Sequence, residues 1–186
     1  MNPRLVRVVL LSLLLGLSGS TAVLQAQPTP SEYQVKAAYL LNFAKFVQWP
    51  TNAFETTNAP IIIGVLGENP FEGNLESMIQ GKAVCGRPLA VKFFASAKDA
   101  GLKRCQILFV CQSERKRLND IVTALKGAGV LTVSELESFL GAGGMFNFIM
   151  EANKVRFEVN EAAVKQSGLC VSSKLLNLAR RKEREL

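Results

Sequence analysis

The chain opens on an apolar stretch behind two basic residues, and segments of helical and strand pattern follow it. Arg4 and Arg7 precede the apolar run 8–17, which is shorter than the roughly 20 residues that span a bilayer. Residues 1–26 therefore predict a secretory signal peptide, cleaved after Ala22 or Ala26, with an uncleaved anchor as the alternative. We expect a linker at 27–30, one domain at 31–182 and a tail at 183–186.

The first segment of the expected domain is strongly apolar. Ser31 and Gln34 have capping-box spacing, which predicts a helix over about 32–48. The helix ends at Trp49-Pro50, because the residue before a proline disfavours helix. Its apolar residues are too many for one narrow stripe, so we expect burial on more than one side.

Strand and helix patterns alternate through the middle of the chain. Apolar runs, the first of them strongly β-branched, predict four strands at 60–66, 89–94, 106–111 and 130–133. Asn69-Pro70 supplies an N-cap and a first-turn proline for a helix at 70–80, and apolar spacing predicts an amphipathic helix at 114–126. This alternation favours a parallel sheet with helices on both faces.

The last third of the chain has a different pattern. Two short strand-like runs, 145–150 and 155–159, surround a polar turn and predict a β-hairpin. Helices at 161–166 and 172–181 follow. The predicted fold class is a single-domain α/β fold, with a mostly parallel sheet, flanking helices, and a C-terminal β-hairpin and helices.

Composition narrows the classes of function. The 186 residues include 22 Lys and Arg, 15 Asp and Glu, and no histidine. Histidine-based nucleophile pairs, His-ligated zinc and histidine proton shuttles are therefore excluded. We expect no catalytic residue, no metal and no cofactor, and an envelope hydrolase using Ser and Lys is the weakest alternative. The basic runs 115–117 and 180–182 are interrupted by glutamates, which favours solvated helix faces over a nucleic-acid partner, with anionic membrane headgroups as the other alternative.

Two glycine-containing segments are candidates for contact with a ligand. Gly67, Glu68 and Asn69 follow the first strand, where α/β folds bind anions at a helix N-terminus. This segment is a candidate ligand or anion turn, with a plain turn as the alternative. At 141–144 we favour a segment that turns the chain into the hairpin.

Three segments together resemble one family. They read AAYLLNFAKFVQWP at 37–50, GVLGENPF at 64–71, and GGMFNF, VRFEVN and SSKLL at 143–148, 155–160 and 172–176. Their order and spacing resemble the YfiR family of periplasmic proteins over essentially the whole mature chain. The resemblance implies an α/β domain that dimerises and has no known catalysis. It also implies a repressor of a YfiN-like inner-membrane diguanylate cyclase, controlling cyclic-di-GMP and biofilm formation, with a YfiB-like outer-membrane protein as a further partner.

The cysteines only partly follow the family. Cys85, Cys105, Cys111 and Cys170 are even in number in an exported chain, which favours disulfides, with free buried thiols as the alternative. The resemblance gives Cys105 a partner on the first strand near Gly64, where this chain has no cysteine, and the family's second cysteine pair has no counterpart either. If the strand order is 2-1-3-4, Cys85 and Cys105 both lie at the N-terminal end of their strands. Cys111 lies at the opposite end of the third strand, roughly 20 Å from Cys105, which is beyond disulfide reach. We expect Cys85–Cys105, with Cys111 paired to Cys170 or free.

Because the sequence shows no recognisable set of catalytic residues, we expect the protein to act by binding other proteins. Tyr39, Phe43, Phe46 and Trp49 are the candidate partner or dimer surface, because aromatic residues concentrate at interfaces, and ordinary core packing is the alternative. A periplasmic small-ligand module that reports to a membrane sensor kinase is the alternative function. It would use the turn at Gly67 and the ends of the strands.

Overall fold

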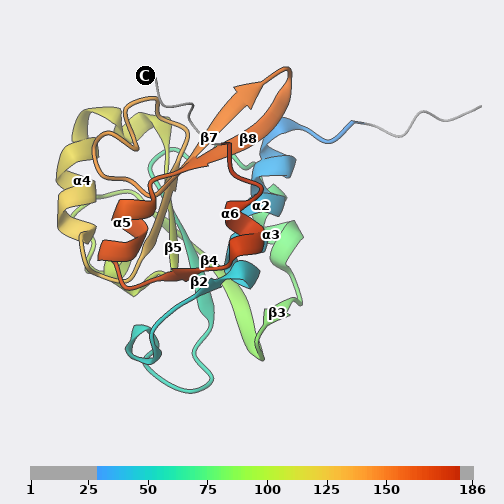
Figure 1. Cartoon of the computed structure of the whole chain (residues 1–186). Helices are drawn as coiled ribbons and strands as arrows, with labels where there is room; N and C mark the ends of the chain where they lie inside the picture. The colour runs from blue at the N-terminus through green and yellow to red at the C-terminus, as the bar shows by residue number, and fades with distance from the viewer. Residues whose placement is uncertain (1–28, 181–186) are drawn as a thin grey trace, which may run out of the picture.

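The structure is a computed structural model that describes residues 29–180 (Figure 1). The predicted signal peptide at 1–26 and tail at 183–186 lie outside the described residues, as does part of the linker. No helix among residues 29–180 is long and apolar enough to cross a membrane.

A seven-stranded sheet forms the centre of the molecule, in the order β3-β4-β2-β5-β6-β7-β8. The parallel strands are β4 (Arg87–Phe94), β2 (Ile61–Leu66), β5 (Ile107–Val110), β6 (Leu131–Ser134) and β7 (Phe146–Glu151). Antiparallel strands flank them at the two edges, β3 (Ala83–Val84) and β8 (Lys154–Val159). The order of the first four predicted strands is the 2-1-3-4 order assumed for the cysteines, and the predicted hairpin is confirmed. Ala152 and Asn153 turn the hairpin with positive φ angles of 46° and 58°.

Helices cover both faces of the sheet, as predicted (Figure 1). Successive residues of β5 point to opposite faces, so Ile107 and Phe109 pack in the core beneath α2 (Glu32–Phe46), whereas Leu108 and Val110 pack beneath α4 (Leu118–Leu125). Two apolar cores result, one on each face. The remaining helices are α3 (Asn74–Ile79), α5 (Glu161–Gln166) and α6 (Ser173–Leu176), with 3-10 turns η1 (Thr51–Ala53), η2 (Ala100–Arg104) and η3 (Gln112–Arg117).

Helix α2 has the predicted capping box but ends earlier than predicted. The Ser31 hydroxyl accepts from the Gln34 amide, and the Gln34 side chain accepts from the Ser31 amide. The helix ends at Phe46, because β1 (Val47–Gln48) pairs with β9 (Cys170–Val171) near the other end of the chain. The helix packs against the sheet and contacts α3 and α6, so the predicted burial on more than one side is confirmed.

Three other predicted helices have different bounds in the structure. The helix predicted at 70–80 begins only at Asn74, because Glu72 and Gly73 have φ angles of 50° and 82° that interrupt helical backbone. The first residues of the helix predicted at 114–126 belong to the 3-10 turn η3, and the α-helix α4 begins only at Leu118. The helix predicted at 172–181 is a single turn, α6, and its continuation folds back so that the Arg180 amide donates to Phe157.

Candidate functional site at the carboxyl edge of the sheet

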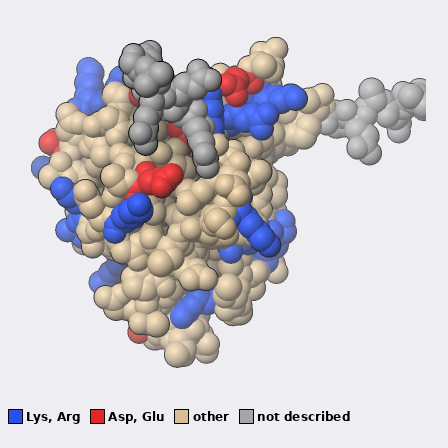
Figure 2. Space-filling view, viewed as in Figure 1, with Lys and Arg blue, Asp and Glu red and all other residues tan. Residues whose placement is uncertain are grey.

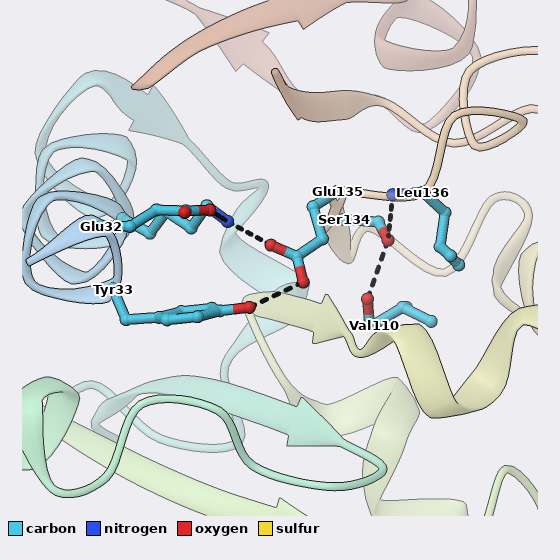
Figure 3. Close-up of polar contacts among 7 residues, drawn as sticks. Glu32, Tyr33, Val110, Ser134, Glu135 and Leu136 are labelled. Atoms are coloured by element: carbon cyan, nitrogen blue, oxygen red, sulfur yellow. Dashed lines mark hydrogen bonds and ion pairs between the residues drawn. The ribbon is translucent and has the colours of Figure 1, made fainter. Parts of the chain in front are cut away.

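The carboxyl ends of three parallel strands meet at one edge of the sheet. β2 ends at Leu66, β5 at Val110 and β6 at Ser134. Glu135, which follows β6, points toward the first turn of α2 (Figure 3). Open parallel sheets bind ligands at this edge, outside the carboxyl ends of the strands. The edge is therefore the candidate site.

A buried polar network joins α2 to this edge (Figure 3). The Tyr33 hydroxyl donates to Oε1 of Glu135 at 3.0 Å, and Lys36 forms ion pairs with Glu135 and Glu32. The Lys36 side chain is 3% exposed and that of Glu135 is 7% exposed, whereas that of Glu32 is 42% exposed. The Lys36 ammonium also lies 4.4 Å from the centroid of the Tyr33 ring. Each buried charge thus has an opposite charge and a further polar or aromatic partner, as burial of ions requires.

The Tyr33 hydroxyl is fixed as a donor in this network. Burial raises its pKa above the ordinary range, and the hydrogen bond to the Glu135 carboxylate and the negative charge of that carboxylate raise it further. Tyr33 therefore stays protonated at any physiological pH and holds Glu135 as an acceptor.

Ser134 positions Glu135 through the backbone. Its hydroxyl donates to the carbonyl of Val110 at 2.8 Å and accepts from the amide of Leu136 at 3.3 Å (Figure 3). The serine side chain therefore joins β5 to the turn that follows β6, and this turn directs Glu135 toward α2.

The predicted anion turn uses its amides internally. The Gly67 amide donates to Phe94, the Glu68 amide donates to the Ser113 hydroxyl, and Oδ1 of Asn69 accepts from the Phe71 amide. No helix begins at this turn, since α3 starts at Asn74. A Cβ on Gly67 would lie 2.3 Å from Oγ of Ser113, so glycine is needed for close packing. This arrangement favours the plain turn, and at 141–144 the segment likewise turns the chain, with Gly144 packed against Phe139.

The four aromatic residues of the predicted partner surface do not share one surface. Phe43 is fully buried, with its ring among those of Tyr39, Phe146, Phe148 and Phe157. Tyr39 is half-buried against the same rings. Placing Phe43 on an interface was wrong, because it belongs to the core.

The other two predicted aromatic residues lie at the end of α2. Trp49 is half-buried and donates its indole N–H to the Gln106 carbonyl at 3.0 Å. This bond ties the loop after β1 to the start of β5, as expected of a structural residue. Phe46 remains as an exposed aromatic, with 37% of its surface in solvent.

All four cysteines are free in the structure, so the expected Cys85–Cys105 bond is not formed. Cys85 is exposed in the turn between β3 and β4, at the outer edge of the sheet. Cys105 is buried beside β5, and strands β4 and β2 separate that position from the edge. Cys111 is buried and Cys170 is exposed. Burial raises the pKa of both Cys105 and Cys111 to about 12, so both stay neutral thiols.

Gly64 explains why Cys105 has no partner. A Cβ placed on Gly64 would lie 2.8 Å from Sγ of Cys105. The thiol therefore fills the space beside the strand position where the family resemblance puts a second cysteine. The packing neighbour is the one that the resemblance implies, but glycine there leaves no sulfur to bond.

Residues 115–117 and Arg180, the part of the two basic runs that the structure describes, are exposed to solvent. Lys and Arg side chains are scattered over the face in Figure 2 and do not form one patch there. Arg117 pairs with Glu114, and Arg180 pairs with Glu151 and Glu158.

The buried network was missed at the sequence level, although α2 carries a signal for it. Lys36 lies between Val35 and Ala37 in a helix that has few polar positions facing the core. A lysine on a buried helical face requires a carboxylate partner. Its partner Glu135 is 99 residues away, which periodicity cannot reveal.

Comparison with known proteins finds a solved structure of similar fold and a matching family model. A crystal structure of a conserved domain protein from Vibrio cholerae O1 biovar El Tor strain N16961 is similar in fold, with a TM-score of 0.55 and 13% identity. The match covers 80% of this chain and 59% of that one, so the chain spans well under two thirds of that protein. The family model described as YfiR/HmsC-like matches residues 33–180. The chain therefore belongs to the YfiR/HmsC-like family, which supports a periplasmic regulatory role in cyclic-di-GMP signalling.

Proposed function

We propose that the protein is a periplasmic repressor that binds an inner-membrane diguanylate cyclase of the YfiN kind and lowers cyclic-di-GMP. The observation that carries this proposal is the family match over residues 33–180, nearly the whole described chain. In this proposal the regulator acts as a homodimer, and a YfiB-like outer-membrane protein sequesters it. A regulator of this type acts by binding one conformational state of its partner more tightly than another.

The rigidity of the α2 face supports a role in contact. Backbone pairing of β1 with β9 fixes the end of α2, and the Ser172 amide donates to the Phe46 carbonyl. Phe46 is thus an exposed aromatic residue on a fixed backbone. Such residues contribute strongly to binding at low entropic cost. We propose Phe46 as the centre of the cyclase contact.

The test measures cyclic-di-GMP in the organism that encodes the protein. Deletion of the gene is expected to raise the nucleotide level, and the wild-type gene is expected to restore it. Phe46→Ser should fail to restore the level, whereas Phe93→Ser, which removes a 50% exposed phenylalanine from β4, should restore it. An unchanged level after deletion would contradict the repressor function, and full activity of Phe46→Ser would contradict only the contact.

The alternative function, a small-ligand module, is favoured by one observation. A cleft of about 270 Å³ lies at the carboxyl edge of the sheet, next to the network of Lys36 and Glu135.

A further inference from the structure

A hollow of about 360 Å³ lies near the amino ends of β2, β5 and β6, on the face of the sheet that carries α4. Alternation along β2 places Ile62 on the same face as Leu66, and alternation along β4 places Lys92 on the same face as Phe94. Both Leu66 and Phe94 pack in the core beneath α4, so Ile62 and Lys92 line the hollow from one side of the sheet. We call the hollow the basic hollow, and its lining includes Glu55, Ile62, Lys92, Lys103, Arg104 and Cys105.

The basic hollow lies beside a connection between parallel strands that contains little helix. Parallel neighbours in a sheet are usually joined by an α-helix that packs on the sheet. Between β4 and β5 the chain forms only the five-residue 3-10 turn η2. The sheet beside this turn is therefore incompletely covered, and Ile62 is only half-buried.

Positive charge exceeds negative charge in the basic hollow. Three cations, Lys92, Lys103 and Arg104, line it together with one carboxylate, that of Glu55. Arg104 pairs with Glu55 at 3.1 Å. Among the residues that the structure describes, Lys92 and Lys103 have no carboxylate partner. Two ammonium groups therefore remain to attract an incoming anion.

Lys92 lies close enough to Cys105 to influence its thiol. Burial raises the pKa of Cys105, and the positive charge of Lys92 opposes that rise. The carboxylate of Asp99 acts on the same thiol, but it accepts from the Gly101 amide at 2.7 Å and does not line the hollow. The hollow thus has a positive charge next to a buried, neutral group.

Part of the lining is apolar. Ile62, Phe54 and Cys105 contribute to it, and Phe54 is held by the Arg87 guanidinium, which lies 3.8 Å from the centroid of its ring. Ligand sites commonly combine such apolar walls with a few charged groups, in volumes of about 300–1,000 Å³. An inorganic ion would leave the apolar wall in water, whereas an organic group attached to an anion would cover it.

We propose that the basic hollow binds a small organic phosphate monoester, with its phosphate between Lys92 and Lys103 and its organic group against Ile62 and Phe54. A phosphate monoester carries a charge of about −1.5 to −2 at pH 7, which matches two free ammonium groups. Lysine is also a common phosphate ligand in proteins. This inference goes beyond repression and does not depend on it. The ligand chemistry is shared by free phosphate esters and by the headgroup of phosphatidic acid.

The experiment titrates the purified chain with phenyl phosphate at low ionic strength and follows the backbone amides of Ile62, Lys103 and Gly129, which line the hollow, by NMR. Saturable shifts at these amides are expected. Inorganic phosphate should bind about tenfold more weakly, because it has no ring to cover the apolar wall. Phenol, which is uncharged, and benzoate, which carries a single charge, should also bind more weakly. Equal binding of any of the three, or shifts that do not saturate, would overturn the proposal.

Substitutions test the charges of the hollow in both directions. Lys92→Gln and Lys103→Gln should each weaken binding about threefold, as expected for one exposed charge, and the double variant about tenfold if the two effects add. Glu55→Gln should instead strengthen binding about twofold, because it removes the carboxylate that pairs with Arg104. Lys98→Gln, which changes an exposed lysine outside the hollow, is the matched control and should bind like the wild type. Wild-type affinity in the double variant, or weaker binding in Glu55→Gln, would overturn the assignment.

A second arm distinguishes the two sources of the phosphate. The probes are phosphatidylcholine vesicles that contain either phosphatidic acid, a phosphate monoester, or phosphatidylglycerol, a diester. Binding that requires phosphatidic acid and is lost in the double lysine variant assigns the hollow to a lipid headgroup. Binding of phenyl phosphate without a preference between the vesicles assigns it to a free small molecule. Neither arm measures cyclic-di-GMP, so failure here and failure of the repressor function are distinguishable.

Discussion

Replacing Lys36 by methionine tests whether the network at the carboxyl edge stabilises the fold. Methionine fills most of the volume of the lysine stem, so little of the effect comes from a cavity. The substitution leaves the Glu135 carboxylate, 7% exposed, with the Tyr33 hydroxyl as its remaining hydrogen-bond donor. Removing one partner of a buried pair costs about 3–5 kcal/mol. Because the cleft gives Glu135 some contact with water, we expect about 3 kcal/mol, the low end of that range.

The assay is urea unfolding at pH 7, followed by the fluorescence of Trp49, the single tryptophan of the chain. For a domain of this size, a loss of about 3 kcal/mol corresponds to a fall in melting temperature of roughly 6–12 °C. Glu32→Gln is the matched control. The Glu32 side chain is 42% exposed, so its loss should cost at most about 1 kcal/mol.

A double-mutant cycle separates the pair from the individual side chains. Glu135→Gln in the Lys36→Met background should cost less than in the wild type, with a coupling of about 2 kcal/mol. A cost below about 1 kcal/mol for Lys36→Met, or additive effects within about 0.5 kcal/mol, would show that the two charges do not depend on each other.

Three further predictions concern the thiols. Under native conditions a maleimide should label Cys85 and Cys170 and spare Cys105 and Cys111, as intact-mass and peptide analysis would show; rapid labelling of all four would refute the burial. Gly64→Cys should form a disulfide with Cys105 on oxidation, because the new Cβ would lie 2.8 Å from that sulfur, and non-reducing peptide mapping detects the bond. The pKa of Cys105 and of Cys111 is raised to about 12, so the folded state keeps protons that the unfolded state loses above about pH 9. Stability is then complete below about pH 9 and falls as the pH rises toward 12, by about 1.4 kcal/mol per pH unit and thiol, and Cys105→Ala should reduce this slope in urea unfolding at several pH values.

Local pattern predicted the core of the fold correctly. The apolar runs at β2, β5 and β6 are continuous because these strands are buried on both faces, and this signal does not depend on distant residues. The β7–β8 hairpin was also predicted, since its two strands are neighbours in the sequence.

The bounds of the helices and the candidate site depended on more distant contacts. α2 ends at Phe46 because β1 pairs with β9, more than 120 residues later in the chain. The aromatic residues of α2 follow helical spacing, but only the packed structure places Phe43 in the core and leaves Phe46 exposed.

The sequence by itself determined the type of most elements and their succession along the chain, because periodicity and turn residues act within a few positions. The tertiary structure decided which side chains meet. It brought Lys36 to Glu135 and kept Cys85 away from Cys105. These contacts depend on how strands and helices pack across the sheet, and the charges and hydrogen bonds of the candidate site arise from that packing.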